Sequence, residues 1–408
     1  MKNYNVGVIG LGNRGQALLS SMLACEECNV IGVSDLYPDR IEIGQKIVTK
    51  IRGKTPKGYI NWKELVDDPL IEVVFIVCDW EMHIPMSIYA MEKGKIVGSE
   101  VAGAYSTQDC WALVDTYERT KTPIMMLENC CFDEFELLSN AIYRDGLLGE
   151  ILYAHGAYCH DLREEITGGK VNRHYRLRNY INRNSENYPT HELGPIAKIL
   201  DINQGNRIVS LSSNATRSGV ALEAFTRDER CPDPSLNGQK FAQSDIVITT
   251  LKTEKDQLIT LRLDTSLPNY YGREFTLRGT KGLTKADLKL VLLDGEIPEN
   301  YDTFDFYKKT MGNSENYKEK YLPKIWKDIT PTQRDLGHGG MDYIEFRIFF
   351  DCLNEGREFP IDVYDMASWM AITPLSEESL KNNGSTIEFP DFTRGKYKIR
   401  KPKSVLGE

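Results

Sequence analysis

Residues 5–15 read Asn-Val-Gly-Val-Ile-Gly-Leu-Gly-Asn-Arg-Gly, and this stretch decides the fold of the first part of the chain. A short apolar strand enters a Gly-x-Gly-x-x-Gly turn, made by Gly10, Gly12 and Gly15, which opens a helix. In such a turn the first glycine permits the bend, the second lets the backbone approach a pyrophosphate, and the third lets helix and strand pack closely. The helix N-terminus adds free N–H groups and a positive dipole. The stretch predicts a dinucleotide-binding unit.

Asp35 strengthens this prediction. It follows Gly15 by twenty positions and closes the next apolar run, Val-Ile-Gly-Val-Ser-Asp. An acidic side chain at this place accepts hydrogen bonds from the adenosine ribose hydroxyls, which favours NAD over NADP. The competing interpretation is a glycine turn with a structural role alone. The strand, the helix and the acid at the right distance together favour a cofactor site for NAD.

Composition limits the class of protein. The chain has 408 residues, a formal net charge of −9 and a pI near 5.4. This length suits two domains, and the acidic balance argues against nucleic acid or an anionic membrane as a partner. No apolar run approaches the length of a membrane span. The first strand begins within a few residues of the start, which leaves no room for a secretory leader, so we expect a cytoplasmic protein.

The nine cysteines form no regular framework, and their number is odd. A fold built on disulfides is therefore not expected. Cys25-Glu-Glu-Cys28 has the spacing of a redox or zinc site, but no second pair or histidine spacing lies nearby. Ordinary, partly buried thiols are the better interpretation, and no metal site is predicted.

Strands and helices alternate over residues 1–128. Continuous Val/Ile runs are typical of strands buried on both faces, so this part is predicted to form a doubly wound parallel sheet, an NAD-binding Rossmann domain. The expected strands are Val6–Ile9, Val30–Val33, Val73–Val77, Ile96–Gly98 and Ile124–Leu127. The expected helices are Gln16–Ala24, Arg40–Lys50, His83–Lys93 and Gln108–Arg119.

A different pattern begins near Gly149. Strands with alternating polar and apolar residues follow one another, as in an antiparallel sheet. They are expected at Ile208–Asn214, Ala242–Lys252, Gln257–Thr265, Arg273–Gly279 and Leu290–Leu293, and two helices at Met341–Cys352 and Val363–Lys381. Residues 300–330 show no clear period and are expected to form a surface excursion. We therefore predict an α+β substrate-binding domain over 129–408, whose late helices can pack back on the first domain.

The carboxyl ends of the parallel strands carry the first candidate site residues. Trp80 and His83 follow the third of these strands, and Glu128-Asn129 follows the last. Glu100-Val101 follows the fourth strand, and up to this point the chain resembles the glucose-fructose oxidoreductase and inositol dehydrogenase (Gfo/Idh/MocA) superfamily. Those dehydrogenases carry Glu-Lys-Pro here, and the lysine helps to move the hydroxyl proton. Val101 cannot move a proton, which argues against a plain alcohol dehydrogenase.

Further motifs resemble one branch of that superfamily, glycoside hydrolase family 109, the NAD-dependent α-N-acetylgalactosaminidase family. They are Tyr158-Cys-His-Asp-Leu-Arg163, Tyr188-Pro-Thr-His-Glu-Leu-Gly-Pro195, Asn203-Gln-Gly-Asn-Arg207, Gly337-His-Gly-Gly-Met-Asp342 and Pro390-Asp-Phe-Thr-Arg-Gly395. The resemblance extends over almost the whole chain. Two positions depart from the family pattern: Tyr175 stands where tryptophan is usual, and Glu192 where glycine is usual. A carboxylate beside His191 can alter which sugar is accepted.

The resemblance implies a set of binding residues. NAD contacts are expected, besides the three glycines, at Asn13, Arg14, Asp35, Trp80, His83, Glu100, Val101 and Asn129. Substrate contacts are expected at Tyr158, Arg176, Tyr188, His191 and Tyr271, with Tyr271 favoured over its neighbour Tyr270. The substrate class is a small-molecule or glycan-terminal sugar, and a homo-oligomer is expected.

The resemblance also implies a redox route to hydrolysis, an exception to the usual pair of carboxylates. The sugar is oxidised at C3, the C2 proton is removed, the C1 substituent leaves, water adds, and C3 is reduced again. His191 suits the C3 hydroxyl. Tyr158 or Tyr188 takes the C2 proton. Glu128 either orients a neighbouring group or acts as a base. Arg176 either lowers the pKa of a phenol or binds an anionic group of the substrate.

The alternative function is an NAD-dependent sugar or polyol dehydrogenase in which His191 replaces the missing lysine. A catalytically silent NAD-binding sensor is the third interpretation. The set of proton-transfer residues makes the sensor the weakest of the three.

Overall fold

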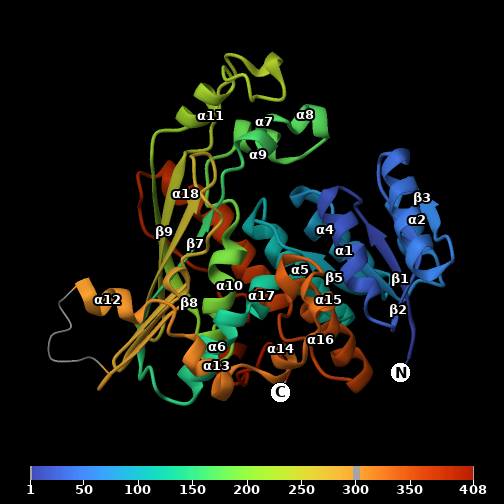
Figure 1. Cartoon of the computed structure of the whole chain (residues 1–408). Coiled ribbons are helices and arrows are strands. Elements are labelled where there is room, and N and C mark those ends of the chain that lie inside the picture. Colours follow the sequence, from blue (N-terminus) through green and yellow to red (C-terminus); the bar gives the residue numbers. More distant parts are fainter. Residues whose placement is uncertain (1, 297–303, 408) are drawn as a thin grey trace. The chain divides into compact units, whose positions relative to one another are not determined.

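The computed structural model describes residues 2–296 and 304–407, and it divides into two compact units (Figure 1). The first unit contains Met1–Phe132, Asp328–Ala371 and Lys403–Glu408, and the second contains Asp133–Lys327 and Ile372–Pro402. Two late segments of the chain thus group with its first 132 residues.

The first unit contains a six-stranded parallel sheet, which confirms the predicted Rossmann-like fold. Its strand order is β3-β2-β1-β4-β5-β6, so the order reverses direction at β1. The strands are β1 Tyr4–Ile9, β2 Cys28–Ser34, β3 Lys57–Tyr59, β4 Val73–Ile76, β5 Ile96–Glu100 and β6 Ile124–Leu127. All pairs are parallel. Ligands of such sheets bind at the carboxyl ends of the strands, where the order reverses.

Helices flank this sheet and alternate with its strands along the chain. They are α1 Asn13–Leu23, α2 Pro38–Arg52, α3 Trp62–Asp67, α4 His83–Glu92, α5 Thr107–Thr120, α15 Pro331–Arg334, α16 Met341–Glu355 and α17 Val363–Met370, with 3-10 turns η1 Trp80–Met82, η2 Asn129–Phe132 and η5 His338–Gly340. Helix α16 supplies Phe346 and Phe349, whose rings lie 5.2 and 5.0 Å from that of Phe75 on β4. These contacts join a late helix to the centre of the first sheet.

The second unit contains an eight-stranded sheet in the order β13-β12-β11-β7-β10-β9-β8-β14. Its strands are β7 Ile151–Cys159, β8 Ile208–Ala215, β9 Ile246–Thr253, β10 Leu258–Asp264, β11 Thr276–Gly279, β12 Gly282–Lys285, β13 Leu290–Leu293 and β14 Ile387–Glu388. Neighbouring strands pair antiparallel except β7 and β10, which pair in parallel. The predicted, mainly antiparallel sheet is therefore confirmed.

Helix α10 packs against β7, and Gly156 shows how closely. A Cβ atom at Gly156 would lie 2.1 Å from the carbonyl oxygen of Glu192 on α10. The helices of this unit are α6 Glu134–Arg144, α7 Arg163–Thr167, α8 Gly169–Asn172, α9 Arg176–Asn182, α10 Pro189–Ile199, α11 Val220–Phe225, α12 Phe304–Thr310, α13 Glu315–Tyr321, α14 Lys324–Asp328 and α18 Ile372–Lys381, with 3-10 turns η3 Pro234–Leu236, η4 Ala286–Leu288 and η6 Lys396–Lys398.

One expectation about local structure was wrong. The single helix expected over Val363–Lys381 is two helices, α17 and α18, and Ala371 ends the first of them. The surface excursion expected over residues 300–330 contains α12, α13 and α14, each of five to seven residues. Helices this short display too few turns for an apolar period to be visible. Residues 300–303 of that segment lie outside the described residues.

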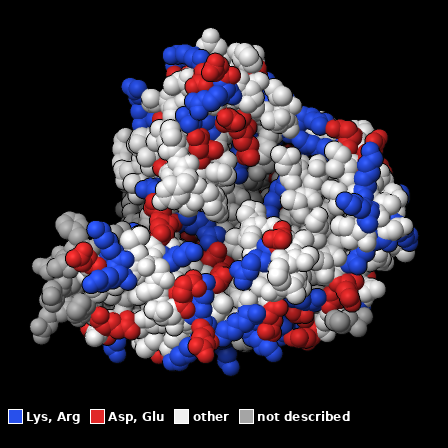
Figure 2. All heavy atoms as spheres, viewed as in Figure 1, with Lys and Arg blue, Asp and Glu red and all other residues white. Residues whose placement is uncertain are grey.

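The surface carries both signs of charge. Figure 2 shows Lys and Arg side chains intermingled with Asp and Glu over the face that is viewed. All nine cysteines are free thiols. Among the described residues, no helix is both long and apolar enough to cross a membrane.

Candidate active site

The glycine turn in the first unit combines two glycines that the fold requires with one that it does not. Gly10 has φ +95°, and a Cβ atom there would lie 2.4 Å from the carbonyl oxygen of Val77. A Cβ atom at Gly15 would lie 2.0 Å from the carbonyl oxygen of Gly10. At Gly12 the nearest atom would be an Arg40 guanidinium nitrogen at 3.7 Å. The space beside Gly12 is therefore open to a ligand.

The start of α1 provides donors for that space. Gly12 is the N-cap residue, and no side chain caps the first turn of this helix within the described chain. Uncapped N–H groups at a helix N-terminus suit a phosphate group. These features fit the pyrophosphate of a dinucleotide, with Asn13 and Arg14 in the first turn.

Asp35 lies at the end of β2 and faces this turn. Its Oδ2 accepts a hydrogen bond from the Leu11 N–H at 2.7 Å, and its Oδ1 accepts one from the Tyr37 N–H at 3.0 Å. The carboxylate is thereby held at the carboxyl edge of the sheet, where an adenosine ribose is expected.

Trp80 and His83 follow β4 at the same edge of the sheet, and both are buried. His83 Nε2 lies 3.2 Å from the carbonyl oxygen of Cys78. Burial lowers the pKa of His83, although the charge of Glu100 opposes the shift. A neutral imidazole in a fixed orientation is the result.

Arg14 is the centre of a charged network at the carboxyl edge of the sheet. Its Nε donates to Glu100 at 2.7 Å, and its Nη1 donates to Asp342 of α16 at 2.6 Å. Asp342 also accepts a hydrogen bond from Asn129 Nδ2 at 2.7 Å, and His338 Nδ1 lies 3.1 Å from it. The network joins five predicted site or motif positions from four segments that are far apart in the sequence.

The charges in this network stabilise one another. Burial alone would lower the pKa of Arg14, but Glu100 and Asp342 raise it well above its usual value. Burial alone would raise the pKa of Asp342, but Arg14 and His338 hold it well below its usual range. Both groups are therefore ionised at neutral pH, and Arg14 has a fixed position.

Glu345 is a buried acid next to this network. Neither of its carboxyl oxygens has a hydrogen-bond partner among the described residues. Burial, followed by the charges of Glu100 and Asp342, raises the pKa of Glu345 well above its usual value. Both burial and the neighbouring charges therefore favour the protonated, uncharged form of this carboxyl group.

Val101 and Glu128 are two further predicted positions in the first unit. Val101 is buried directly after β5, and its N–H donates to Glu100 Oε2 at 2.9 Å. Glu128 is fully buried after β6, and its Oε1 accepts a hydrogen bond from the Cys130 N–H at 3.1 Å. Val101 brings an apolar side chain to this edge of the sheet, as its sequence position predicts.

An aromatic cluster forms in the second unit. Tyr158, near the end of β7, lies with its ring centroid 4.5 Å from that of Tyr188 and 5.6 Å from that of His191. The Tyr188 and His191 rings are 4.8 Å apart at 81°. Tyr188 immediately precedes α10 and His191 lies in its first turn, so the helix fixes both rings. The three candidate proton-transfer residues of this unit therefore lie together.

A positive charge lies against this cluster. The guanidinium of Arg176, at the start of α9, lies 5.0 Å from the Tyr188 ring centroid and pairs with Glu165 at 2.7 Å. Burial alone would lower the pKa of Arg176, but the neighbouring tyrosines and Glu165 raise it. A cation this close to phenols favours their ionised form.

Tyr271 and His160 extend the cluster. The Tyr271 ring lies 6.2 Å from that of Tyr158 and 5.4 Å from that of His160. Tyr271 is 44% exposed and Tyr270 is 67% exposed. Burial, followed by the charge of Arg176, lowers the pKa of His160. The cluster therefore has one partly exposed tyrosine at its edge.

Glu192 is directed away from solvent. It is fully buried, its carboxyl group interacts with that of Glu186, and neither of its carboxyl oxygens has a hydrogen-bond partner among the described residues. Burial raises the pKa of Glu186 to about 8 and that of Glu192 well above its usual value. A direct contact of Glu192 with a sugar, which its place beside His191 suggested, is therefore disfavoured.

Sequence reasoning did not assign roles to Asp342, Glu345, Glu186 or His160. Asp342 and His160 lie inside two of the family motifs, Gly337–Asp342 and Tyr158–Arg163, and their place in these motifs indicates a role at the site. Glu186 and Glu345 had no signal, because a buried acid without a cation cannot be distinguished from an exposed acid in a sequence.

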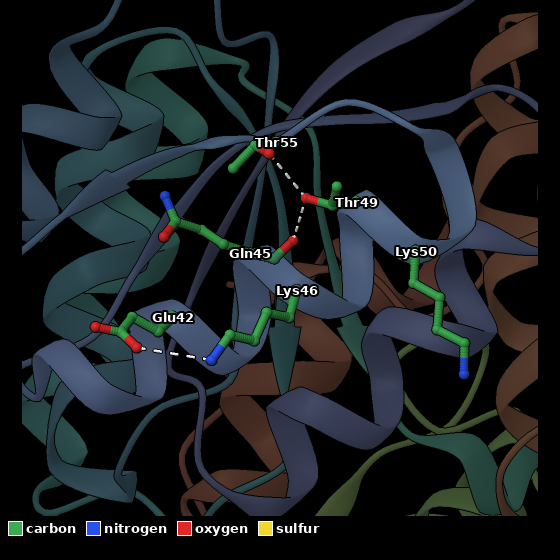
Figure 3. Close-up of a pocket in the computed structure, with 6 residues that line it drawn as sticks. All are labelled: Glu42, Gln45, Lys46, Thr49, Lys50 and Thr55. Atoms are coloured by element: carbon green, nitrogen blue, oxygen red, sulfur yellow. Dashed lines mark hydrogen bonds and ion pairs between the residues drawn. The ribbon is translucent and has the colours of Figure 1, made fainter.

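Two surface hollows lie away from these residues. One, of about 540 Å³, lies on α2 and is lined by Glu42, Gln45, Lys46, Thr49, Lys50 and Thr55 (Figure 3). Its polar side chains have partners within α2 and the segment after it: the Thr49 hydroxyl bonds to the backbone carbonyl oxygen of Gln45 and to the Thr55 hydroxyl, and Lys46 pairs with Glu42. The other, of about 600 Å³, includes Arg207, Glu254 and Tyr397. Neither contains a predicted site residue.

Comparison with known sequences relates the chain to one family. Residues 133–399 match the family described as "Glycosyl hydrolase 109, C-terminal domain". A glycosyl hydrolase family 109 protein of Stenotrophomonas maltophilia is 34% identical over 98% of this chain and 91% of that protein. An α-N-acetylgalactosaminidase of Bacteroides fragilis is 35% identical over 96% of this chain and 92% of that protein.

Comparison with solved structures supports the fold. Levoglucosan dehydrogenase, solved in complex with NADH and levoglucosan, matches with a TM-score of 0.71 at 18% identity over 95% of this chain and 100% of that chain. The scyllo-inositol dehydrogenase of Lactobacillus casei, solved with NAD(H) and scyllo-inositol, matches with a TM-score of 0.64 at 12% identity over 95% of this chain and 99% of that chain. At these identities the likeness shows the fold alone.

Proposed function

Because the chain belongs to glycosyl hydrolase family 109, we propose that it uses NAD as a resident cofactor and cleaves a terminal α-linked N-acetylgalactosamine or a related hexoside. The family makes the protein a glycoside hydrolase. One observation supports the finer proposal most strongly: Tyr158, Tyr188 and His191 form a compact set of proton-transfer groups beside the guanidinium of Arg176.

The first unit has the features that NAD needs. The open space beside Gly12 and the uncapped start of α1 suit the pyrophosphate, and Asp35 suits the ribose hydroxyls. When bound, NAD supplies reversible hydride transfer at a sugar carbon, which acidifies the neighbouring C–H bond. Val101 adds no proton-transfer group at this edge, so the protein must supply those groups elsewhere.

The second unit supplies the proton-transfer groups. His191 accepts the proton of the C3 hydroxyl, and a phenolate of Tyr158 or Tyr188 removes the C2 proton. Arg176 stabilises the phenolate through its charge. Glu165 holds Arg176 in place through their ion pair at 2.7 Å. Loss of the C1 substituent, addition of water across C1 and C2, and return of the hydride to C3 complete the hydrolysis with no net change of oxidation state.

Turnover of p-nitrophenyl α-N-acetylgalactosaminide without added NAD tests the proposal. We expect release of p-nitrophenol without net formation of NADH, and deuterium at C2 of the sugar when the reaction runs in D₂O. No release from a panel of hexosides by protein shown to contain NAD would overturn it. His191→Ala should lose about 10²-fold or more in kcat, as expected for a missing general base.

Tyr158→Phe and Tyr188→Phe identify the C2 base. The variant that removes the base should lose both turnover and incorporation of deuterium at C2. The other variant should keep the C2 exchange. If both variants keep full exchange, neither phenol is the base and this part of the proposal is wrong.

The second candidate function is an NAD-dependent sugar or polyol dehydrogenase, favoured by the fold likeness to dehydrogenases of that substrate class. This function predicts steady accumulation of NADH with a free sugar. A hydrolase that returns the hydride within each turnover does not accumulate NADH.

A further inference from the structure

Glu186 and Glu192 enclose the Tyr188–His191 segment in the sequence, and their carboxyl groups meet in the interior of the second unit. Glu186 lies in the loop before α10, and Glu192 lies in the first turn of that helix. Both side chains are buried. The pair is thus close in the chain to Tyr188 and His191, two of the three residues that the proposed function considers for proton transfer.

Within the described part of the chain, no cation forms an ion pair with either carboxyl group of this pair. Oε2 of Glu186 and both carboxyl oxygens of Glu192 have no partner among the described residues other than the opposite carboxyl group. The titratable groups that face Glu192 from the sheet are Cys159 of β7 and Arg262 of β10. Arg262 already donates to Glu274 at 2.5 Å and to the Cys159 sulfur at 3.0 Å. Two adjacent, dry carboxyl groups cannot both ionise, so the pair retains protons.

The backbone links the pair to the segment. Oε1 of Glu186 accepts the N–H of Tyr188 at 3.4 Å. The backbone of Glu186 is fixed on its other side by α18, since Ser376 Oγ accepts its N–H at 2.8 Å and Thr373 Oγ1 donates to its carbonyl oxygen at 2.7 Å. A negative charge that forms on the two carboxyl groups therefore acts on the rigid loop before α10 and on the first turn of that helix.

We propose that Glu186 and Glu192 form a proton-holding acid pair that is uncharged in the active enzyme and that positions Tyr188 and His191. Loss of a proton from the pair places a negative charge behind the aromatic cluster. Such a charge opposes formation of a phenolate and stabilises a protonated imidazole, so it removes both bases that the reaction needs. The pair positions these bases and does not touch the substrate. The catalytic consequence rests on the proposed function, but the pair itself does not.

The ring signals of His191 report the charge on the pair. The chain has six histidines, so ¹³C-labelled histidine gives a simple NMR spectrum in which His191→Asn identifies the signal of interest. We expect the His191 signal of the wild-type protein to show an inflection near pH 8, where the pair loses its first proton. In Glu192→Gln this inflection should move toward the acid range, because the remaining carboxyl group has a neutral amide neighbour. In the double variant Glu186→Gln/Glu192→Gln it should vanish.

The control is Glu150→Gln, which removes an exposed carboxyl group of the same unit and should retain the wild-type titration. A wild-type protein without the alkaline inflection, or a double variant that retains it, would overturn the proposal. Glu192→Gly, which introduces the residue expected from the family pattern, gives the same acid shift and serves if the double variant does not fold.

Activity provides a separate readout. Wild-type kcat should fall about fivefold between pH 8 and pH 9 with little change in KM, and the double variant should lack this fall. An equal alkaline fall in the double variant would overturn the catalytic role. Where no glycoside is cleaved, the proposed function fails, while the NMR titration still decides whether the acid pair exists.

Discussion

Gly12 and Gly15 belong to one turn, yet a Cβ atom would meet different surroundings at the two positions. At Gly15 it would overlap the carbonyl oxygen of Gly10, whereas at Gly12 it would point into open space. The fold therefore requires glycine at position 15, whereas it leaves room for a side chain at position 12, where we propose that the pyrophosphate binds. The sequence motif alone treats the two as one signal.

Gly12→Ala and Gly15→Ala should separate these requirements. Gly15→Ala is expected to reduce the free energy of unfolding by about 1–3 kcal/mol or more, since backbone atoms must move. Gly12→Ala is expected to cost about 1 kcal/mol or less, yet to weaken NAD binding at least tenfold because its methyl group occupies the pyrophosphate position. Urea unfolding and calorimetric titration with NAD⁺ measure both effects. Wild-type NAD affinity in Gly12→Ala would contradict the assignment.

Glu345 predicts a pH dependence of stability. The pKa of this buried carboxyl group is raised above its ordinary value near 4.5, so the folded state holds the proton more tightly than the unfolded state. Its contribution to stability is fully present below about pH 4.5 and is lost as the pH rises toward the folded-state pKa.

Glu345→Gln removes this titration. The free energy of unfolding of the variant, minus that of the wild type, should therefore grow with pH from about pH 5 to about pH 8, by up to about 1.4 kcal/mol per unit. Urea unfolding across this range provides the measurement, with the exposed Glu150→Gln as the matched control. Parallel curves for Glu345→Gln and the wild type would show that Glu345 is ionised in the folded protein.

Residues whose role follows from local spacing could be predicted from the sequence, and residues whose role depends on distant neighbours could not. Gly10 and Asp35 have roles set by a turn and by a fixed separation. Asp342 acts through Arg14, more than three hundred positions away, and Glu345 acts through its burial. A single sequence shows neither which distant residues are in contact nor which side chains are buried.

At the scale of elements, the contact between α10 and β7 determines where His191 lies. The contact is made backbone to backbone at Gly156, with no room for a side chain. The position of α10, and of the aromatic residues that it carries, therefore depends on residue 156 having no side chain.

Gly156→Ala should move α10 away from the sheet. We expect a loss of about 1–3 kcal/mol in the free energy of unfolding, together with a fall in kcat of at least tenfold, because Tyr188 and His191 move with the helix. Gly272→Ala is the matched control, since its Cβ atom would meet only the exposed ring of Tyr270, which can turn away. Unchanged kcat in a destabilised Gly156→Ala would contradict this role of the helix.

The sequence predicted the elements of the first sheet better than those of the second. Buried parallel strands are continuous apolar runs, and each is separated from the next by a helix. In the second unit β12 is only four residues long, and β7 and β10 pair in parallel although most of the sheet is antiparallel. Pairing partners and the break at Ala371 depend on tertiary contacts, which local residue patterns do not encode.

At the scale of the whole molecule, the proposed cofactor should act as a ligand that stabilises the folded chain. NAD⁺ at about one hundred times its Kd should add about 2.7 kcal/mol to the free energy of unfolding of cofactor-free protein. NADP⁺ should add less, because the Asp35 carboxylate repels a 2′-phosphate. Differential scanning calorimetry gives the two shifts. Equal shifts with both nucleotides, or a difference that persists in Asp35→Ala, would argue against this role of Asp35.

The first unit is assembled from three separate stretches of chain, and the rings of α16 that pack on Phe75 belong to a late one. During synthesis the ribosome releases the parallel strands long before it makes Phe346 and Phe349. Until then one face of β4 lacks its apolar cover, and the nascent chain carries an exposed, aggregation-prone surface through most of translation. A chaperone that binds the exposed face of β4, or a change in the rate of translation, would therefore influence the yield of folded protein without altering any residue of the site.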